Sequence, residues 1–531
     1  MADAIVIGAG PNGLVAANRL ADAGWEVLVL EANDEVGGAV RSGELVEPGF
    51  TSDLFSAFYP LAVASPAVRD LRLEEHGVRW CRSALACAHP TPGATYAAVA
   101  TDDVDATAAT CEAYAAGDGD AWRALYGRWE QVGDRLVEAL LTPFPPLRAA
   151  LRLAARLGPS GVLPFLRFGV LPVRRAGEEE FTGAGGPLLL AGNTLHADFL
   201  PESTGGALFG WLLASLAQQV GFPVPEGGAG RLTGAMARRL EVRGGRIELG
   251  TRVTRVVVRR GRATAVQTAD GRELPARRAV LADVAAPALF LELVGEEHLP
   301  AGLLAGLRRF EWDCGTVKVD WTLDGPIPWE AEPVGEAGTV HVGRDLDELS
   351  RHALSLAVGE IPERPFLVLG QYSAIDPSRM PEGREVAWAY THVPQRVRGD
   401  AGGEGLTGAW DEREANAFAD RVEAQVERFA PGFRDLIRAR HVFDPPKLAA
   451  ADANLVGGAL NGGTAQIHQQ LVFRPISGLG RAETPIGGLY LASASAHPGG
   501  GVHGACGANA ARAALAAAPG LRRALAARLS R

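Results

Sequence analysis

A glycine-rich turn between a buried strand and a helix constrains the fold of this chain more than any other feature. The sequence predicts an apolar strand at 4–7, a glycine turn, a helix at 14–23 and a second apolar strand at 26–30 that ends in an acid. Short apolar runs of this kind are typical of parallel strands buried on both faces. The order of these elements predicts a parallel sheet that binds a dinucleotide.

The turn has the spacing G-x-G-x-x-G, with glycines at Gly8, Gly10 and Gly13. The first glycine permits the tight turn, the second lets the backbone approach a pyrophosphate, and the third lets the helix pack closely on the strand. Pro11 and Asn12 lie in the turn that leads into the helix, whose N-terminus presents N–H groups and partial positive charge to phosphates. We expect this whole turn to bind the cofactor.

The residues after the second strand distinguish NAD from FAD. Glu31, next to Ala32, is placed to accept hydrogen bonds from ribose hydroxyls. The segment 31–41 then has the pattern E-x(5)-G-G-x-x-R, which resembles the glutathione-reductase type of FAD domain. This resemblance implies that Gly38, Ala39 and Arg41 lie along the diphosphate and ribityl chain, and FAD is therefore the predicted cofactor.

A later segment supplies further strands. Residues 225–290 predict a helix to about residue 240, followed by strands at 246–249, 253–259, 264–268 and 279–283. Their order resembles the second FAD-domain segment of flavin oxidoreductases, which implies that the backbone at Val253 meets the adenine. Farther along, the sequence predicts a strand at 315–323 and a helix at 412–429.

These elements predict an α/β protein in which a glutathione-reductase-type Rossmann FAD domain is interleaved with an α+β substrate domain. The expected FAD-binding domain is discontinuous and comprises residues 1–85, 225–290 and 446–531. The expected substrate or lid domain comprises residues 86–224 and 291–445.

The C-terminal region contains another glycine loop. A strand at 488–494 leads into His497-Pro-Gly-Gly-Gly-Val-His-Gly504, and a helix follows at 505–517. Three of these glycines repeat the G-x-G-x-x-G spacing, but no second strand with an acid follows, so a second dinucleotide site is not expected. A glycine loop that enters a helix N-terminus suits an anion or a polarised ring.

The segments 484–491, 497–504 and 507–511, with the upstream Phe473-Arg-Pro475, resemble the phytoene desaturase-related FAD-dependent oxidoreductases of bacterial type. Within them they resemble the branch named after pyridine nucleotide-disulfide oxidoreductase domain-containing protein 2. The resemblance implies non-covalent FAD, with Gly500, Gly501 and Val502 close to the flavin and ribityl chain.

Composition limits the classes of partner and cofactor that we expect the chain to bind. The net charge is −10 and the sequence pI is about 5.7, whereas nucleic-acid binding needs a basic face, so no nucleic-acid partner is expected. The five cysteines form no C-x-x-C pair, which argues against a dithiol centre or a disulfide framework. We predict no metal site and a cytoplasmic location. The longest uncharged stretch is broken by prolines and glycines, so it predicts a buried helix at 208–220 instead of a membrane span.

An arginine-rich stretch at 135–175 has two interpretations. It contains leucine, phenylalanine and proline among its arginines, and no acidic residue after Glu138. A basic amphipathic stretch can lie on a membrane surface, which would make the protein peripheral to the inner face of the membrane. The other interpretation is a solvated pair of helices in a lid domain.

The predicted function is a dehydrogenase or desaturase-like FAD-dependent oxidoreductase that transfers hydride from a largely apolar small molecule to flavin, with isomerisation left open. His497 is the candidate proton carrier, although it could simply shape the following turn. Because the flavin carries the difficult step, few side chains need take part. The alternatives are an amine-oxidase-like flavoenzyme and a flavoprotein with a binding or regulatory role. The electron acceptor stays open between oxygen and quinone.

Overall fold

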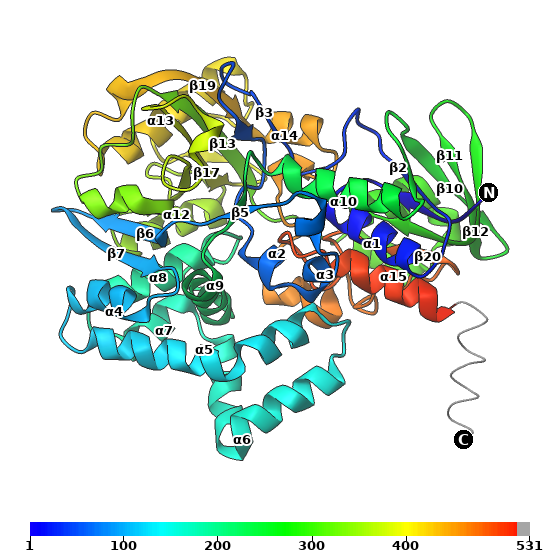
Figure 1. The fold of residues 1–531 in the computed structure, drawn as a ribbon, viewed down its shortest axis with the longest axis horizontal. Coiled ribbons are helices and arrows are strands. Elements are labelled where there is room, and N and C mark those ends of the chain that lie inside the picture. The colour runs from blue at the N-terminus through cyan, green and yellow to red at the C-terminus, as the bar shows by residue number, and fades with distance from the viewer. Residues whose placement is uncertain (518–531) are drawn as a thin grey trace.

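The computed structural model describes residues 1–517, which are arranged around two large sheets (Figure 1). The expected cofactor segment 446–531 thus includes residues 518–531, which lie outside the described residues. The fold is a mixed α/β fold, as predicted.

The first sheet has a parallel centre. Its parallel strands, in spatial order, are β20 (Leu489–Leu491), β12 (Glu273–Ala282), β1 (Ala2–Ile7), β2 (Val27–Leu30) and β9 (Arg246–Glu248). The first half of β12 also pairs antiparallel with β11 (Arg262–Thr268), which pairs with β10 (Val253–Arg259). The C-terminal strand returns to this sheet as expected, although it is shorter than the predicted 488–494.

Helices α1 (Pro11–Asp22), α10 (Gly230–Val242) and α15 (Ala505–Ala517) share one apolar core with the first sheet (Figure 1). The helix predicted at 14–23 begins three residues earlier, because proline fits the first turn of a helix. On the opposite face, α11 (Ala301–Leu307) packs Leu303 and Leu307 into the core of this sheet. It does so although the sequence-based division assigns 291–445 to the other unit.

The second sheet is mixed. Its strands, in spatial order, are β19 (Ile437–Phe443), β13 (Gly315–Leu323), β17 (Glu385–Val393), β16 (Leu367–Gln371), β14 (Ala337–Val342), β6 (Leu85–Thr91) and β7 (Thr95–Ala100). Only β14 and β6 pair in parallel among them. The strand predicted at 315–323 is confirmed. One face packs on α13 (Glu412–Glu427) and the other on a group of helices that includes α9 (Gly206–Val220).

The remaining described helices are α2 (Pro60–Ala64), α3 (Pro66–Arg69), α4 (Val104–Glu112), α5 (Asp118–Leu141), α6 (Leu147–Val170), α7 (Val173–Glu180), α8 (Gly185–Thr194), α12 (Leu346–Val358) and α14 (Pro445–Ala451). Short strand pairs join β3 (Ser42–Gly43) to β4 (Ser52–Asp53), β5 (Trp80–Cys81) to β8 (Val224–Pro225), and β15 (Glu360–Ile361) to β18 (Gly399–Asp400).

The two stretches for which the sequence analysis considered contact with a membrane are both helical. The segment expected at 208–220 is α9, and its side chains are mostly buried, as predicted. The arginine-rich stretch forms the end of α5, all of α6 and the start of α7. Helix α6 projects from the body of the molecule (Figure 1). Within residues 1–517, none of the helices combines the length and apolar character needed to cross a bilayer.

Candidate cofactor site

The first glycine turn is built by backbone packing. A Cβ on Gly13 would lie 2.2 Å from the carbonyl oxygen of Gly8, so the first turn of α1 tolerates only glycine there. The paired glycines join this turn, because a Cβ on Gly38 would lie 3.2 Å from the Cα of Gly10. The two motifs predicted to bind the cofactor therefore lie against each other, with no side chain between them.

The C-terminal helix meets the first helix at the same place. A Cβ on Gly507 would lie 1.9 Å from the carbonyl oxygen of Asn12, and one on Gly504 would lie 2.7 Å from Val15. This contact brings the loop 499–504 beside the N-terminus of α1, which agrees with the expectation from the sequence. The close spacing of Gly504 and Gly507 is a signal that the sequence analysis did not use.

Glu31 is fixed at the end of β2. Its carboxylate accepts hydrogen bonds from the backbone amides of Ala9 at 2.7 Å and Asn33 at 2.9 Å. Its carbonyl oxygen accepts a hydrogen bond from Thr251 N, two residues before Val253. Glu31 and Val253 are thus held close together, as the predicted ribose and adenine contacts require. Ala32 is half-buried beside them.

Arg41 is bound to the protein. Its guanidinium donates to the carbonyl oxygens of Gly38 and Ala451 and pairs with Glu35, each at 2.9 Å. Ala39 accepts a hydrogen bond from the Ser56 hydroxyl at 2.7 Å. These contacts close the loop that follows the paired glycines. A direct contact of Arg41 with the diphosphate stays a prediction.

Two buried acids border the glycine turns and were not predicted. The Asp283 carboxylate accepts a hydrogen bond from Gly13 N at 2.8 Å, and the same oxygen would lie 2.8 Å from a Cβ on Gly10. Burial raises the pKa of Asp283 to about 7, and the charges of Asp452 and Glu31 add to the shift. Asp283 ends the predicted strand at 279–283, so its position at the sheet edge was a usable signal. Asp452 had no such signal.

Two glycines of the C-terminal loop are required for different structural reasons. A Cβ on Gly500 would lie 2.4 Å from the side-chain oxygen of Asn461, so packing within the protein already requires glycine. Gly501 has a φ of +100°, and a Cβ there would lie 2.9 Å from Leu61 of α2. Val502 is half-buried and packs against the core of the first sheet. Contact of this loop with the flavin stays a prediction.

His497 is held by the end of α5. One ring nitrogen lies 3.0 Å from the carbonyl oxygen of Thr142, and Phe144 packs edge-on at 6.1 Å. Its other nitrogen is buried without a hydrogen-bond partner. Burial lowers the pKa of His497 below its usual value, so the ring is neutral. These contacts fasten the glycine loop to the helices, and a proton-carrying role stays a prediction.

FAD fits this arrangement of residues. The glycine turns form a surface of bare backbone, which a pyrophosphate can approach closely. Helix α1 has no side-chain cap at Gly10, and the side-chain oxygen of Asn12 is buried without a hydrogen-bond partner. The Asp283 carboxylate already binds Gly13 N in this first turn, and a helix N-terminus favours an anion.

The second sheet presents aromatic side chains next to α2. Trp388 and Tyr390 lie on the same face of β17, with ring centres 6.1 Å apart. Phe58 stacks on Tyr372 at 6.2 Å and lies 5.7 Å from Trp388. Leu61, three residues after Phe58, contacts the C-terminal glycine loop. We call Phe58, Tyr372, Trp388 and Tyr390 the aromatic cluster. The short helix α2 lies between this cluster and the predicted flavin loop.

Histidines buried near this cluster are neutral. The rings of His196 and His341 approach to 2.7 Å between nitrogens, and Tyr390 donates to the carbonyl oxygen of His196 at 3.1 Å. Burial lowers the pKa of His196 to about 3 and that of His392 to about 4. Burial also places the pKa of His341 well below its usual value. This side of the sheet therefore holds uncharged rings at neutral pH.

A buried network of charges borders the aromatic cluster. The Arg379 guanidinium binds Asp53 at 2.7 Å, and Tyr372 donates to the same carboxylate at 2.5 Å. Lys318 donates to the carbonyl oxygen of Asp53 at 3.0 Å and also binds the carboxylate of Asp320. Burial raises the pKa of Asp320 to about 6, although the charge of Lys318 opposes the shift. Each of these carboxylates is thus already paired with a cation.

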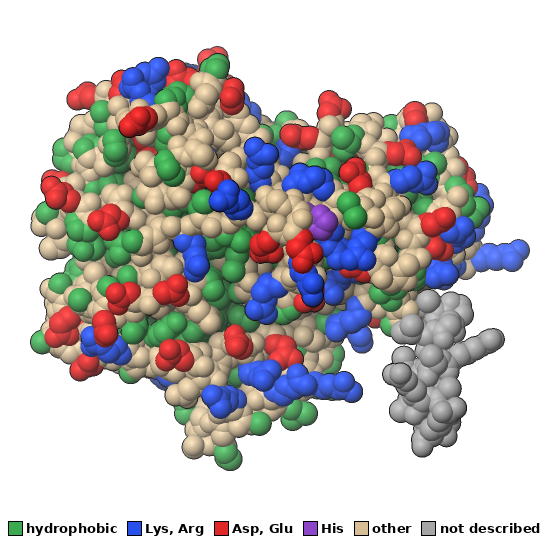
Figure 2. Space-filling model, in the orientation of Figure 1, with side chains coloured by type: hydrophobic (Ala, Val, Ile, Leu, Met, Phe, Trp, Pro, Cys, Tyr) green, Lys and Arg blue, Asp and Glu red, His purple; other side chains and the backbone are tan. Residues whose placement is uncertain are grey.

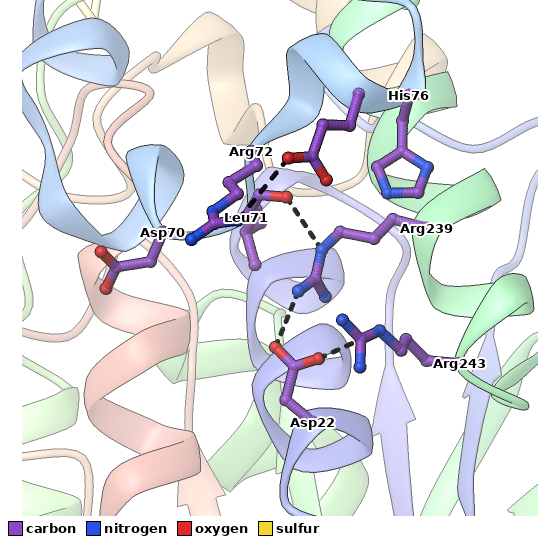
Figure 3. A pocket seen from close by; sticks show the side chains of 8 residues that line it. Asp22, Asp70, Leu71, Arg72, His76, Arg239 and Arg243 are labelled. Carbon is purple, nitrogen blue, oxygen red and sulfur yellow. Dashed lines mark hydrogen bonds and ion pairs between the residues drawn. The ribbon is translucent and has the colours of Figure 1, made fainter.

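A surface cavity of about 370 Å³ lies elsewhere (Figure 3). Arg239 lines it and binds Asp22 at 3.0 Å and the carbonyl oxygen of Leu71 at 2.9 Å. Asp22 ends α1, so the cavity is about 16 Å from the glycine turn at a rise of about 1.5 Å per residue. Its polar groups join α10 to α1, and we assign it no role in cofactor binding.

Known proteins are similar to this chain in sequence or in fold. A family model described as flavin containing amine oxidoreductase matches residues 12–386. The mouse protein named pyridine nucleotide-disulfide oxidoreductase domain-containing protein 2 is 29% identical over 553 residues, which cover 96% of this chain and 92% of the mouse protein. Hydroxyneurosporene desaturase of Cereibacter sphaeroides is 28% identical over 546 residues, which cover 94% of each chain. A solved structure of putrescine oxidase bound to putrescine has a TM-score of 0.61 at 15% identity, covering 97% of this chain and 98% of that one, and shows a likeness of fold.

The fold, the glycine-built site and these similarities define an FAD-dependent oxidoreductase. The chain belongs to the family of flavin-containing amine oxidoreductases, since the matched segment spans most of its length. The predicted cofactor, enzyme class and resemblance to desaturase-related flavoproteins are confirmed.

Proposed function

We propose that this enzyme dehydrogenates an uncharged, largely apolar small molecule at carbon. The observation that carries this proposal is the aromatic cluster, which borders α2 next to the C-terminal glycine loop and lies among neutral histidines. Aromatic rings bind apolar surface well. The name of the similar hydroxyneurosporene desaturase agrees with a substrate of this class.

We propose that the first sheet is a Rossmann unit of the glutathione-reductase type. Its glycine turns and the N-terminus of α1 would hold the FAD pyrophosphate, and Glu31 would hold the ribose. Gly501 and Val502 would contact the flavin. The cofactor unit would comprise 1–85, 225–290 and 446–517, together with α11, and the rest would form the substrate unit.

FAD supplies hydride acceptance when bound. The chain's own residues orient the substrate and exclude water, since the aromatic cluster and the helices over it form a dry core. His497 would hold or release a proton at its unpartnered ring nitrogen. Oxygen or a quinone would reoxidise the enzyme. We propose a cytoplasmic protein whose contact with a membrane is peripheral.

An amine substrate is the second candidate function, because the putrescine oxidase structure shares the fold and an aromatic cluster is present. A protonated amine needs a free carboxylate or an open ring face. Asp53 and Asp320, which border the cluster, already bind Arg379 and Lys318. This pairing favours the uncharged substrate.

The test is anaerobic mixing of the FAD-loaded enzyme with two panels, one of apolar alkenes and cyclic hydrocarbons and one of primary and secondary amines. The visible absorbance of oxidised flavin is followed in each mixture. We expect bleaching by members of the apolar panel and none by the amines. Bleaching by amines alone would establish the second function. If neither panel bleaches a flavin that dithionite reduces normally, the proposed dehydrogenation of apolar substrates is wrong.

A further inference from the structure

Helix α6 exposes large apolar side chains on its outward face. A leucine or valine in the body of a protein rarely stays more than half exposed in such numbers along one helix. The exposed side chains are Leu147 at 66%, Leu151 at 71%, Leu163 at 75%, Leu166 at 61% and Val170 at 56%. Together they form what we call the α6 apolar face.

The inward side of α6 is apolar as well. Phe165 and Phe168 pack on Trp211 of α9, with ring centres 6.2 and 5.5 Å apart, and Leu153 and Leu157 pack against the same core. A surface helix needs only one apolar stripe to pack on its own protein. The α6 apolar face is therefore a second stripe, which packing within the chain does not explain.

The arginines of α6 lie beside this face. Arg148, Arg152 and Arg156 repeat at every fourth residue, as do Leu147 and Leu151, so the two rows run side by side along the helix. Helix α6 also contains Arg167 and no acidic residue. Arg152 pairs with Glu138 of α5 at 2.7 Å and Arg167 pairs with Glu179 of α7 at 2.6 Å, whereas no carboxylate among the described residues pairs with Arg148 or Arg156. Apolar and basic side chains are visible together on this projecting part of the molecule (Figure 2).

The shape of α6 presents both of its halves outward. The backbone leaves helical geometry at Gly158, with φ of 70° and ψ of 168°, which divides the helix into two segments. Leu147 and Leu151 lie on the first segment, and Leu163, Leu166 and Val170 lie on the second. The α6 apolar face thus extends over both segments of a projecting helix, which can insert into a deformable surface.

We propose that α6 docks on an anionic lipid surface, with its apolar face among the acyl chains and Arg148 and Arg156 at the lipid phosphates. Long arginine side chains can reach the headgroups while the helix lies at the boundary. A second copy of the chain is disfavoured, because a symmetric contact through α6 would bring Arg148 and Arg156 of both copies together. Lipid phosphates instead supply the opposite charge.

Docking on a lipid surface rests on the proposed function, because it would bring the enzyme to an apolar substrate. The segment 142–146 joins α5 to α6, and within it Thr142 and Phe144 contact His497 beside the C-terminal glycine loop. Docking through α6 would therefore place the flavin side of the enzyme near the lipid in which an apolar substrate dissolves.

The test is co-sedimentation of the FAD-loaded protein with two kinds of vesicle, phosphatidylcholine alone and phosphatidylcholine mixed with phosphatidylglycerol. The variant Leu151→Ser/Leu163→Ser/Leu166→Ser removes apolar surface that is exposed, so it should fold normally. The matched control is Leu354→Ser/Val358→Ser on α12, where the side chains are 62% and 44% exposed. Arg148→Gln probes the charge.

We expect the wild type to bind the anionic vesicles. The triple variant should lose at least about tenfold in partitioning, Arg148→Gln should lose less, and the α12 control should bind like the wild type. FAD content should be equal in all of them, so a failure of docking is separable from a failure of the flavin site. The proposal is overturned if the triple variant binds as the wild type does, if the wild type ignores anionic vesicles, or if the wild type is a dimer that the triple variant makes monomeric.

Discussion

The proposed cofactor side, which is built on the first sheet, and the proposed substrate side, which is built on the second sheet, are packed by different kinds of contact. On the cofactor side, backbones touch directly, as where Gly13 meets Gly8 and Gly507 meets Asn12. Where the substrate side borders the cofactor side, large side chains from distant parts of the chain meet, as where Arg379 binds Asp53. Backbone contact demands glycine at fixed positions, whereas side-chain contact leaves no local pattern. The contrast explains why one side can be predicted from sequence and the other cannot.

The largest expected effect is on the side-chain network. Arg379→Met would leave the buried carboxylates of Asp53 and Asp376 without their cation. Removing one partner of a buried ion pair destabilises a protein by about 3–5 kcal/mol. We expect a loss of that size in the free energy of unfolding, measured by urea denaturation.

The control for this prediction is Arg308→Met, which breaks an exposed pair with Glu296. Exposed pairs contribute about 0–1 kcal/mol, so this variant should unfold almost as the wild type does. Equal stability of the two variants would show that the network at Asp53 does not join the two sides.

The second-largest effect is expected from a side chain placed in the backbone contact between α15 and α1. In Gly507→Ala, the added methyl would overlap the carbonyl oxygen of Asn12, so α15 must move away from α1. Overpacking of this kind destabilises by about 1–3 kcal/mol, and the displaced helices should hold FAD less tightly. The matched control is Gly302→Ala in α11, where the methyl meets open space. If both variants retain FAD equally through gel filtration, contact between the helices is not needed for the site.

Most of the cofactor side was predictable. The glycine spacing, the acid at Glu31 and the return of the last strand to the sheet follow from local patterns, because each pattern reflects a local backbone requirement. The same reasoning did not find Asp283, although it ends a predicted strand beside Gly8. Parallel strands end at one edge of a sheet, so its position there could have been inferred.

The substrate side was not predictable in this way. Phe58 and Tyr372 are separated by more than 300 residues, and Asp53 and Lys318 are separated by 265. Their meeting depends on how the second sheet packs against the first, which no spacing in the sequence specifies. For the same reason, the sequence assigned α11 to the substrate unit, although it packs on the first sheet.

A smaller effect is expected from pH on the affinity of the protein for FAD. Asp283 has a pKa of about 7 in the folded protein, so its carboxyl is neutral below pH 7 and charged above it. The charged form would repel the FAD diphosphate beside Gly10. The dissociation constant for FAD should therefore be constant below pH 7 and rise above it, by up to about tenfold per pH unit.

Asp283→Asn should remove this pH dependence, because the amide can still accept the hydrogen bond from Gly13 N and carries no charge. Exposed Asp70→Asn is the control and should behave like the wild type. The measurement is fluorescence titration of the apoprotein with FAD from pH 6 to pH 9. A wild-type curve without slope would show that the diphosphate does not lie near Asp283.

The central claim is that glycine loops from opposite ends of the chain build one FAD site. The direct test is the visible spectrum and FAD occupancy of Gly501→Val, compared with the double variant Gly501→Val/Leu61→Ala, which relieves the contact with Leu61. Gly383→Val is the control, because Gly383 also has a positive φ, +77°, and a Cβ there would meet open space. We predict that both Gly501 variants lose or perturb the flavin, while the control keeps the wild-type spectrum. A wild-type spectrum and full occupancy in the double variant would contradict the claim, since the loop would then not touch the flavin.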